Sequence, residues 1–485
     1  MTTPGSFPGQ SIARRLAGGF AWSSLGTLGW RVLTAVSSIL AARILGAAGF
    51  GELGIVRSTA NIFQTFAVFR LGTTASKHMA EFRETDPDRA GRILSMVLFV
   101  SAALCAAMGM ILLVAGGWIA RDIIGNAALE TPLRISSAIM FFQAYGAVRE
   151  TILIGAERFR AFAFVNAVKG GATSVLLVAG TLLGGVTGAV AGLAIGTFLS
   201  FVVLEFSVRK ALASQGIAGN LPFAKWKREI PILWSFALPG LLTGAATAGC
   251  YWIGRVHVAD TPDGFVQLGL FEAANQWRTM VLLVPGALAL AALPIIASSY
   301  GKEAKDDFDE AISLQFNGIL SLALPISVGV IVFADWLMLL FGSEYEGGAD
   351  VLPILMISVF LFALNQSLRR IMDGTGHVWR HTALTAIWVA AFLSTLLVLR
   401  EDATALSLAW AYMLAEAVMA AISIVYVVAV FARWFLVRIA VPLLLAAGAG
   451  TLAVVGQLQG TIWMLAAALV ISVVPLGLFA WSARS

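Results

Sequence analysis

Residues 20–45 read FAWSSLGTLGWRVLTAVSSILAARIL, an apolar run long enough to cross a bilayer, with Arg31 near its middle. The polar residues at helical spacing from this arginine are Ser24, Thr27, Thr34 and Ser38. A charge at mid-bilayer costs roughly 2.5–3.5 kcal/mol on insertion scales, so it usually faces a protein interior or a watery cavity. The stretch therefore indicates a membrane protein with a wet, positively charged interior.

The composition agrees with this interpretation. The chain has 485 residues, of which 59% are hydrophobic and 12% charged. Soluble domains carry about 25% charged residues, so the class is a polytopic membrane protein. The net charge of +5 follows from the charges in the loops and does not indicate a nucleic-acid partner. The cysteines and histidines show no disulfide or metal-ligand pattern, so no metal, cofactor or catalytic set is expected. No cleavable signal peptide is expected either.

Fourteen segments meet the requirement of about 20 mostly apolar residues for one membrane crossing. They are 18–43, 53–75, 92–116, 132–154, 161–183, 188–208, 231–254, 267–292, 311–333, 349–371, 381–399, 404–430, 438–456 and 461–481. The N-terminal end and the even-numbered gaps carry most of the loop lysines and arginines. The odd-numbered gaps carry only Arg43, Arg121, Arg134, Arg255 and Arg400. Because basic residues concentrate in cytoplasmic loops, both termini are expected to be cytoplasmic.

Two stretches of the chain resemble each other. GFGELGI at 49–55 resembles GFVQLGL at 264–270, and ANIFQT at 60–65 resembles ANQWRT at 274–279. The offset spans six predicted helices, which keeps the orientation and suggests parallel halves with a substrate site at their interface. The alternative is chance similarity between apolar helices.

The predicted fold is therefore all-α, with about 14 transmembrane helices in two pseudo-symmetric six-helix lobes plus two C-terminal helices. The predicted parts are a first lobe at 1–208, a basic cytoplasmic linker at 209–230, a second lobe at 231–430, and helices 13 and 14 at 431–485. Glycines recur at every fourth position from Gly180 to Gly196, a spacing typical of close helix packing.

Several polar residues inside the spans are candidates for the substrate site. Arg57 shares a helix face with Asn61 and Gln64, although an arginine near a span end can also snorkel to the interface. Lys169 is a further candidate, and its side chain can likewise snorkel to the cytoplasmic interface. Polar residues in apolar helices often mark substrate pathways, so all of these are candidates for lining a cavity.

Arg278 lies near mid-depth of its span, with Asn275 three residues earlier on the same helix face. The alternative to cavity lining is an internal ion pair with Glu272 or a carboxylate on another helix. Glu416, the deepest acid of its span, could take a coupling proton or pair with a basic residue. The excess of buried positive charge suits an anionic substrate such as a pyrophosphate, because arginine donates bidentate hydrogen bonds to phosphate oxygens.

The chain resembles the polysaccharide transporter branch of the MOP flippase superfamily. The motifs that carry the resemblance are AARILG at 41–46, GFGELG at 49–54, SKHMAE at 76–81, GAERFR at 155–160 and MDGTG at 372–376. The resemblance implies alternating access by two lobes, a bacterial inner-membrane location and an undecaprenyl-diphosphate-linked glycan as substrate. Association with a polysaccharide polymerase and assembly proteins would accompany that role. In the related lipid II flippases, arginines on the first, second and eighth helices hold the pyrophosphate, and Arg31, Arg57 and Arg278 fall on those helices here.

Two other classes remain as alternatives. A cation-coupled multidrug exporter of the same superfamily would favour acidic and aromatic cavity residues and twelve spans. A membrane polysaccharide polymerase or glycosyltransferase usually carries a large outer loop with catalytic residues, whereas the outer gaps here are short.

Overall fold

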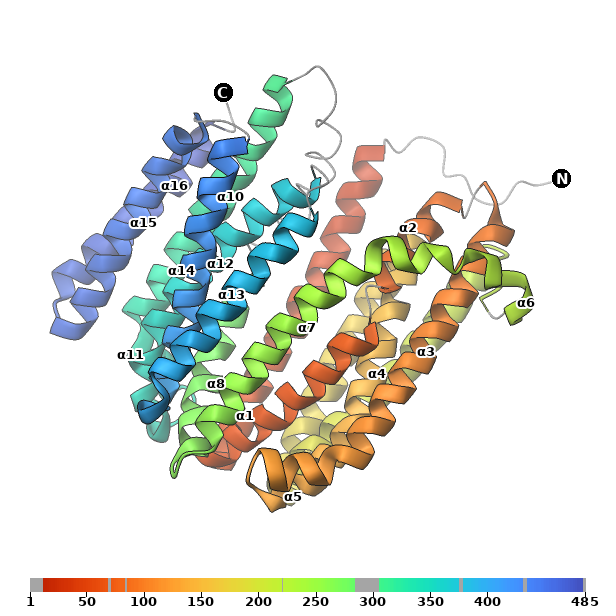
Figure 1. Cartoon of the computed structure of the whole chain (residues 1–485), viewed down its shortest axis with the longest axis horizontal. Helices are drawn as coiled ribbons and strands as arrows, with labels where there is room; N and C mark the ends of the chain where they lie inside the picture. Colours follow the sequence, from red (N-terminus) through yellow and green to blue (C-terminus); the bar gives the residue numbers. More distant parts are fainter. Residues whose placement is uncertain are drawn as a thin grey trace. The chain divides into compact units, whose positions relative to one another are not determined.

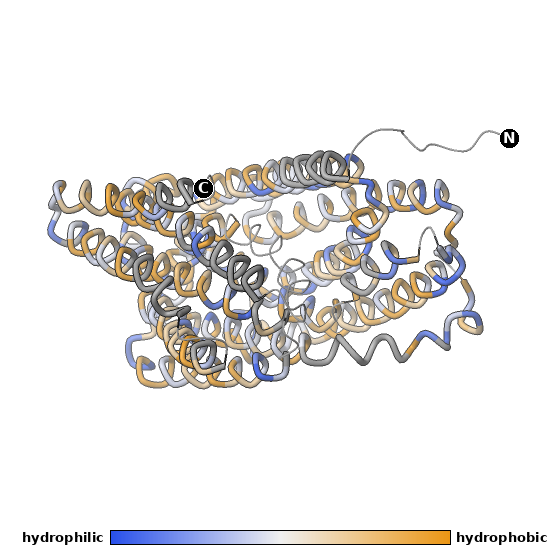
Figure 2. The backbone as a smooth tube through the Cα atoms, turned by 90° about the horizontal axis from the view of Figure 1, so that it is seen from above, coloured by the Kyte–Doolittle hydropathy of each residue, from blue (hydrophilic) through white to orange (hydrophobic). Residues whose placement is uncertain are grey.

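The computed structural model describes residues 12–68, 71–82, 85–219, 221–283, 305–374, 378–430 and 434–482, and every regular element in these ranges is a helix (Figure 1). The prediction of an all-α chain is confirmed. Six helices in the described ranges are long and apolar enough to cross a membrane: Gly26–Val68, Pro87–Ile123, Phe159–Ala213, Val351–Arg369, Trp379–Val398 and Ala405–Tyr426. The total of fourteen crossings stays a prediction. Figure 2 shows hydrophobic residues along the helices and many of the hydrophilic ones at helix ends and turns.

The chain divides into two compact units. Unit 1 comprises Met1–Ile44 and Val56–Leu241, and unit 2 comprises Leu45–Ile55 and Leu242–Ser485. The first helix, α1 (Ile12–Val68), therefore contributes residues to both. The grouping into six-helix lobes stays a prediction.

Unit 1 is a bundle of helices around one apolar core. Besides parts of α1, it contains α2 (Leu71–Phe82), α3 (Pro87–Trp118), α4 (Glu130–Gly155), α5 (Phe159–Ala213) and α6 (Phe223–Trp226). The start of α3 is fixed by Asp86, whose side chain accepts a hydrogen bond from the Arg89 backbone at 2.9 Å, and by a proline in the first helical position. A cluster that includes Met79, Ile93 and Ile152 holds α2, α3 and α4 together.

α5 is two helices that fold back on each other. The break lies at Gly184 and Gly185, and the φ of Gly185, +56°, is a backbone conformation that favours glycine. A methyl group on Gly192 would lie 1.9 Å from the backbone oxygen of Leu176, and one on Gly180 would lie 2.1 Å from that of Gly188. The predicted packing role of the glycine series is confirmed, because only glycine permits this approach.

The predicted basic linker is not a free loop. Trp226 is buried, and the backbone N–H of Leu221 donates to the Ser95 hydroxyl of α3 at 2.9 Å. Glu229 lies 3.6 Å from the Arg92 guanidinium of the same helix. The segment after α5 is therefore anchored on α3 within unit 1.

Unit 2 contains the remaining helices. They are the larger part of α7 (Pro231–Ala259), then α8 (Gly264–Val281), α10 (Lys305–Val332), α11 (Ala334–Leu339), α12 (Val351–Gly374), α13 (Val378–Val398), α14 (Ala405–Val430), α15 (Trp434–Gln459) and α16 (Ile462–Ser482). Aromatic side chains fill its interior, among them Phe271, Trp388 and Tyr412. α15 and α16 pack against each other and against α10, where the Ser321 hydroxyl donates to the Pro475 carbonyl at 3.0 Å.

The two similar sequence stretches contact each other inside unit 2. A methyl group on Gly51 would lie 2.0 Å from the backbone oxygen of Phe265, and one on Gly269 would lie 2.0 Å from that of Ala47. The glycines of both stretches therefore form a close helix crossing.

A carboxylate fixes the start of the first of these stretches. Gly46 interrupts α1 with a φ of +71°, which frees the N–H of Ala47 from the helix ladder. Oε2 of Glu344 accepts a hydrogen bond from that N–H at 3.1 Å, an arrangement that also suits the positive end of a helix dipole. The rings of Phe341 and Tyr345 lie 6.2 and 6.3 Å from the ring of Phe50. Residues 45–55 are thus held in unit 2 by both packing and charge.

We expect Gly51→Ala to lower the thermal midpoint of the detergent-purified protein. The added methyl group meets backbone atoms, which cannot move aside cheaply, and overpacking of this kind costs about 1–3 kcal/mol. Gly29→Ala is the matched control on the same helix, because a methyl group there meets no atom within 4 Å. Equal midpoints for the two variants would contradict the proposed role of the crossing.

Candidate functional site

The predicted site residues are divided between the two units. The unit 1 residues are Arg31, Arg57, Asn61, Gln64 and Lys169. The unit 2 residues are Glu272, Asn275, Arg278 and Glu416.

In unit 1, Arg31 and Lys169 lie against the same indole ring. Nζ of Lys169 is 4.7 Å and Cζ of Arg31 is 5.4 Å from the ring centre of Trp30. α1 and α5 come this close because Gly170 has no side chain; a methyl group there would lie 3.0 Å from Cα of Trp30. A cation over an aromatic ring gains about 0.5–2 kcal/mol, more when water is excluded. The fold thus brings together two cations that lie 138 positions apart in the sequence.

Lys169 also has an anionic partner, Glu150 of α4. Nζ of Lys169 donates to Oε1 of Glu150 at 2.9 Å, and the two side chains are 19% and 18% exposed. Nε of Arg31, by contrast, is buried and has no hydrogen-bond partner among the described residues. Glu150 was not singled out from the sequence; its signal is a carboxylate inside the predicted span 132–154, close to the end of that span.

A small pocket lies beside this ion pair in unit 1. Glu150 and Lys169 line it together with Phe142, Gln143, Thr197, Ser200 and Phe201. The hydroxyls of Thr197 and Ser200 donate to backbone carbonyls of α5 at 2.7 Å, so each keeps its acceptor lone pairs for a ligand. The pocket therefore combines a cation, a carboxylate, an amide and two aromatic rings.

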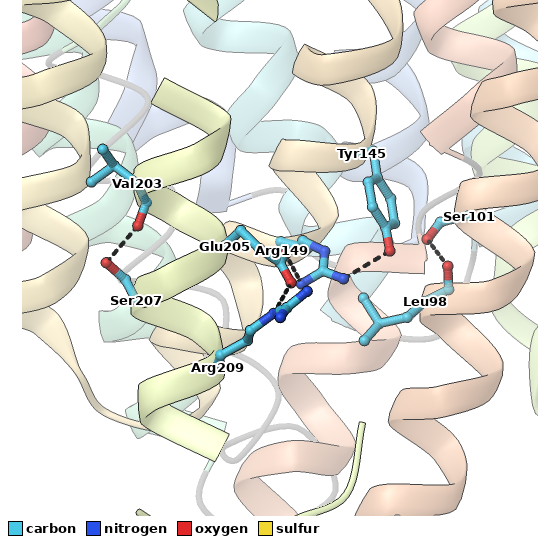
Figure 3. A network of polar contacts seen from close by, with 8 residues as sticks. All are labelled: Leu98, Ser101, Tyr145, Arg149, Val203, Glu205, Ser207 and Arg209. Carbon is cyan, nitrogen blue, oxygen red and sulfur yellow. Dashed lines mark hydrogen bonds and ion pairs between the residues drawn. The ribbon is translucent and has the colours of Figure 1, made fainter. Parts of the chain in front are cut away.

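A second charged group joins α4 to the C-terminal half of α5 (Figure 3). Glu205 pairs with Arg149 and also with Arg209, whose Nε lies 2.6 Å from the carboxylate. Arg149 donates in addition to the Tyr145 hydroxyl at 2.9 Å. Arg149 lies inside α4 and is half-buried, and this carboxylate and this hydroxyl bind its two terminal nitrogens.

Arg57, Asn61 and Gln64 lie on the part of α1 that returns to unit 1. Arg57 and Gln64 are half-buried and Asn61 is exposed. The three side chains follow each other at helical spacing, as the sequence predicts.

In unit 2, the partner of Glu272 is Arg255. Nε of Arg255 lies 2.6 Å from Oε1 of Glu272, and its Nη1 donates to the Tyr412 hydroxyl at 2.9 Å and to the Tyr251 carbonyl at 3.0 Å. The prediction that Arg255 lies in a loop is wrong: α7 continues to Ala259, and the side chain is only 7% exposed. The helix can extend because these three acceptors satisfy the buried guanidinium.

Arg278 is buried, with 8% of its surface exposed, and is enclosed by aromatic rings. Its Cζ lies 5.0 Å from the ring centre of Tyr412, 5.7 Å from that of Phe362 and 6.0 Å from that of Tyr251. Its Nε has no hydrogen-bond partner in the described part of the chain, and the same holds for Oδ1 of the half-buried Asn275. Arg278 is thus held by ring faces and by a hydrogen bond to the Tyr251 hydroxyl, while its Nε donor is unused.

Glu416 is buried and fully engaged by neutral donors. Its Oε2 accepts from Nδ2 of Asn365 at 2.7 Å, and its Oε1 accepts from Nε1 of Trp388 at 3.1 Å. Arg278 is near enough to interact with it electrostatically. Of the two acids predicted as ion-pair or coupling residues, Glu272 therefore forms a direct ion pair and Glu416 a hydrogen-bonded cluster.

We expect Glu272→Gln to destabilise the purified protein strongly. It leaves Arg255 buried without its counter-charge, and breaking such a pair costs about 3–5 kcal/mol. Arg121→Gln removes an ion pair whose arginine is 56% exposed, so that control should cost at most about 1 kcal/mol. Thermal unfolding in detergent measures both variants, and similar losses would contradict a structural role for the buried pair.

Comparison with known proteins supports the family resemblance read from the sequence. The family described as "Polysaccharide biosynthesis protein" matches residues 16–300, and the family MatE matches residues 241–399. The EPS I polysaccharide export inner membrane protein EpsE of Ralstonia nicotianae is 26% identical over 330 residues, which cover 66% of this chain and 72% of that protein.

Solved structures of transporters share the fold. Lipid II flippase MurJ in an inward closed conformation superposes with a TM-score of 0.70 at 15% identity, covering 94% of this chain and 97% of the other. An inward-facing multidrug resistance MATE family transporter of the MOP superfamily superposes with a TM-score of 0.67 at 16% identity, covering 82% and 95%. The family match spans more than half of the residues, and the fold is that of MOP-superfamily transporters. The chain therefore belongs to the polysaccharide biosynthesis protein family.

Proposed function

We propose that this protein is a flippase that moves a polyprenyl-diphosphate-linked oligosaccharide, the repeat unit of a polysaccharide, from the cytoplasmic to the outer leaflet of a bacterial inner membrane. The observation that carries the proposal is Arg31, a half-buried arginine on a membrane-spanning helix whose Nε has no hydrogen-bond partner among the described residues. A guanidinium left in that state suits the oxygens of a phosphate, which it binds in a bidentate manner. The EpsE relative, described as a polysaccharide export protein, supports the same substrate class.

Arg278 is the matching candidate in unit 2. It lies in the predicted span 267–292, its Nε has no partner among the described residues, and aromatic rings enclose its guanidinium. Aromatic contact compensates the positive charge only in part, and Glu416 acts on it electrostatically, whereas Arg255 pairs directly with Glu272. Arg31 and Arg278, with support from Arg57, Lys169, Asn61, Gln64 and Asn275, are therefore the proposed contacts for the anionic headgroup.

The energetics favour outward movement of such a substrate. A diphosphate carries about two negative charges, and moving them out of an inside-negative cell gains about 4–5 kcal/mol per 100 mV if nothing neutralises them. Alternating exposure of the headgroup, with the lipid tail left in the bilayer, would then need no other energy source. Coupling to a cation through Glu416 would add to this drive.

A cation-coupled multidrug exporter is the second candidate, favoured by the MatE match to residues 241–399. The two candidates differ in the charge of the substrate. Export of a cationic dye from cells that express the protein, in place of lipid-linked glycan transfer, would establish the second candidate and exclude the first.

We expect Arg31→Gln and Arg278→Gln each to lower the transfer of lipid-linked oligosaccharide to the outer leaflet by about tenfold or more, because a hydrogen bond to a charged group contributes about 1.5–3 kcal/mol. Arg121→Gln, at an exposed arginine, is the control and should transfer as the parent does. Transfer is measured in reconstituted vesicles at equal amounts of folded protein. Unchanged transfer in both test variants would exclude the proposed contacts.

The charge distribution of the loops predicts that both termini are cytoplasmic. A green fluorescent protein fused after Ser485 should therefore fluoresce, and alkaline phosphatase fused at the same position should be inactive. The reverse pattern would overturn the predicted orientation and the direction of transport that depends on it.

A further inference from the structure

We propose that Glu150 is an exchangeable counter-ion: it holds Lys169 in the empty protein, and a phosphate group of the substrate replaces it on that lysine. The inference rests on the proposed function only in that the anion is taken to be a diphosphate. It assigns a diphosphate-binding position to the Lys169 pocket of unit 1 and adds an acid to the machinery.

The geometry of the pair allows exchange. Glu150 and Lys169 are joined by one contact of 2.9 Å, and both line the open pocket of unit 1. A lysine ammonium has three donors on a flexible stem, so it can turn from a carboxylate to a phosphate without a change in the helices. The side chains are 18% and 19% exposed, so an incoming ligand can reach them.

The neighbouring acid of unit 1 shows why Glu150, and not Glu205, is the exchangeable one. Glu205 is held by two arginines, Arg149 and Arg209, and Arg149 is itself fixed by the Tyr145 hydroxyl (Figure 3). To displace Glu205, a ligand would have to break both ion pairs. Glu205 is also not among the residues that line the pocket. The two carboxylates thus have the same chemistry but differ in how they are held.

The charge around Lys169 favours an anion once Glu150 moves aside. Arg31 lies against the same Trp30 ring as Lys169, and its Nε has no partner among the described residues. Two cations therefore contact one indole ring, and one of them is paired with a carboxylate. A diphosphate that reaches Lys169 would be attracted by both cations, and the Gln143 amide at the wall of the small pocket can donate to it.

The affinity of the purified protein for inorganic pyrophosphate tests the exchange, measured by calorimetry at low ionic strength, where charge effects are largest. We expect Glu150→Gln to bind pyrophosphate about tenfold more tightly, a gain of about 1.4 kcal/mol, since a competing carboxylate is removed. Lys169→Gln should weaken binding. In the double variant Glu150→Gln/Lys169→Gln, the gain from losing the carboxylate should largely disappear. Glu205→Gln is the control, because it changes the net charge by the same amount. Its increase in the logarithm of the pyrophosphate affinity should be less than half of that seen in Glu150→Gln.

Three results would overturn the inference. They are an unchanged or weaker affinity of Glu150→Gln, a gain that persists in full without Lys169, and an equal gain in Glu205→Gln. If the same pattern appears with anionic phosphatidylglycerol in nanodiscs but not with pyrophosphate, the site is a lipid site and the inference also fails. Thermal midpoints show that the variants are folded, and the neutral double variant avoids an unpaired buried charge. Transfer of lipid-linked glycan is measured in a separate assay. If the parent protein transfers glycan but Glu150→Gln does not bind pyrophosphate more tightly, the exchange is disproved and the proposed function is not.

Discussion

The cost of a charged side chain among apolar helices is the constraint on which the rest of this structure depends. An unpaired charge in such a place costs several kcal/mol, so every one that persists needs a partner or a use. Each unit provides partners from within its own helices: Glu150 for Lys169 in unit 1, and Glu272 for Arg255 in unit 2. Aromatic faces provide a weaker form of compensation, and both Arg31 and Arg278 rely on it.

The ion pairs differ in how firmly they are held, and this difference separates structural pairs from functional ones. Arg255 is buried and donates to a carboxylate, a hydroxyl and a backbone carbonyl, so its three contacts have to break together. Lys169 and Glu150 share one contact at the wall of a pocket. A ligand that offers one charged group can replace the second kind of partner but not the first. The number of contacts, more than the depth of burial, therefore decides which charges are available to a substrate.

The sequence predicts the helical class and the main cationic residues well, since hydropathy marks a charge in the middle of an apolar run. The sequence is a poorer guide to whether a charged residue near the end of an apolar run lies inside the helix or in the loop after it. Arg255 is predicted to lie in a gap because hydropathy falls where the charge occurs, yet α7 continues through it. Arg149 and Glu150 lie inside the predicted span 132–154, but the sequence does not show that each has a charged partner on α5. The partner that makes burial possible comes from another helix, as Glu272 and Tyr412 do for Arg255, and a single-sequence pattern does not contain that pairing.

The course of α1 through both units explains why its motif contains glycines, which the sequence alone does not explain. Arg31 and Arg57 lie in unit 1, but residues 45–55 between them belong to unit 2. Glu344 holds the N–H of Ala47, and the close approach at Gly51 and Gly269 leaves no room for sliding. The chain therefore enters unit 2 and returns to unit 1 within the single helix α1. Gly46, with its φ of +71°, is the one residue of α1 with non-helical geometry, and a glycine tolerates further rotation at small cost. Glycine is therefore required in α1 for two different reasons: the left-handed backbone at Gly46 and the close backbone approach at Gly51.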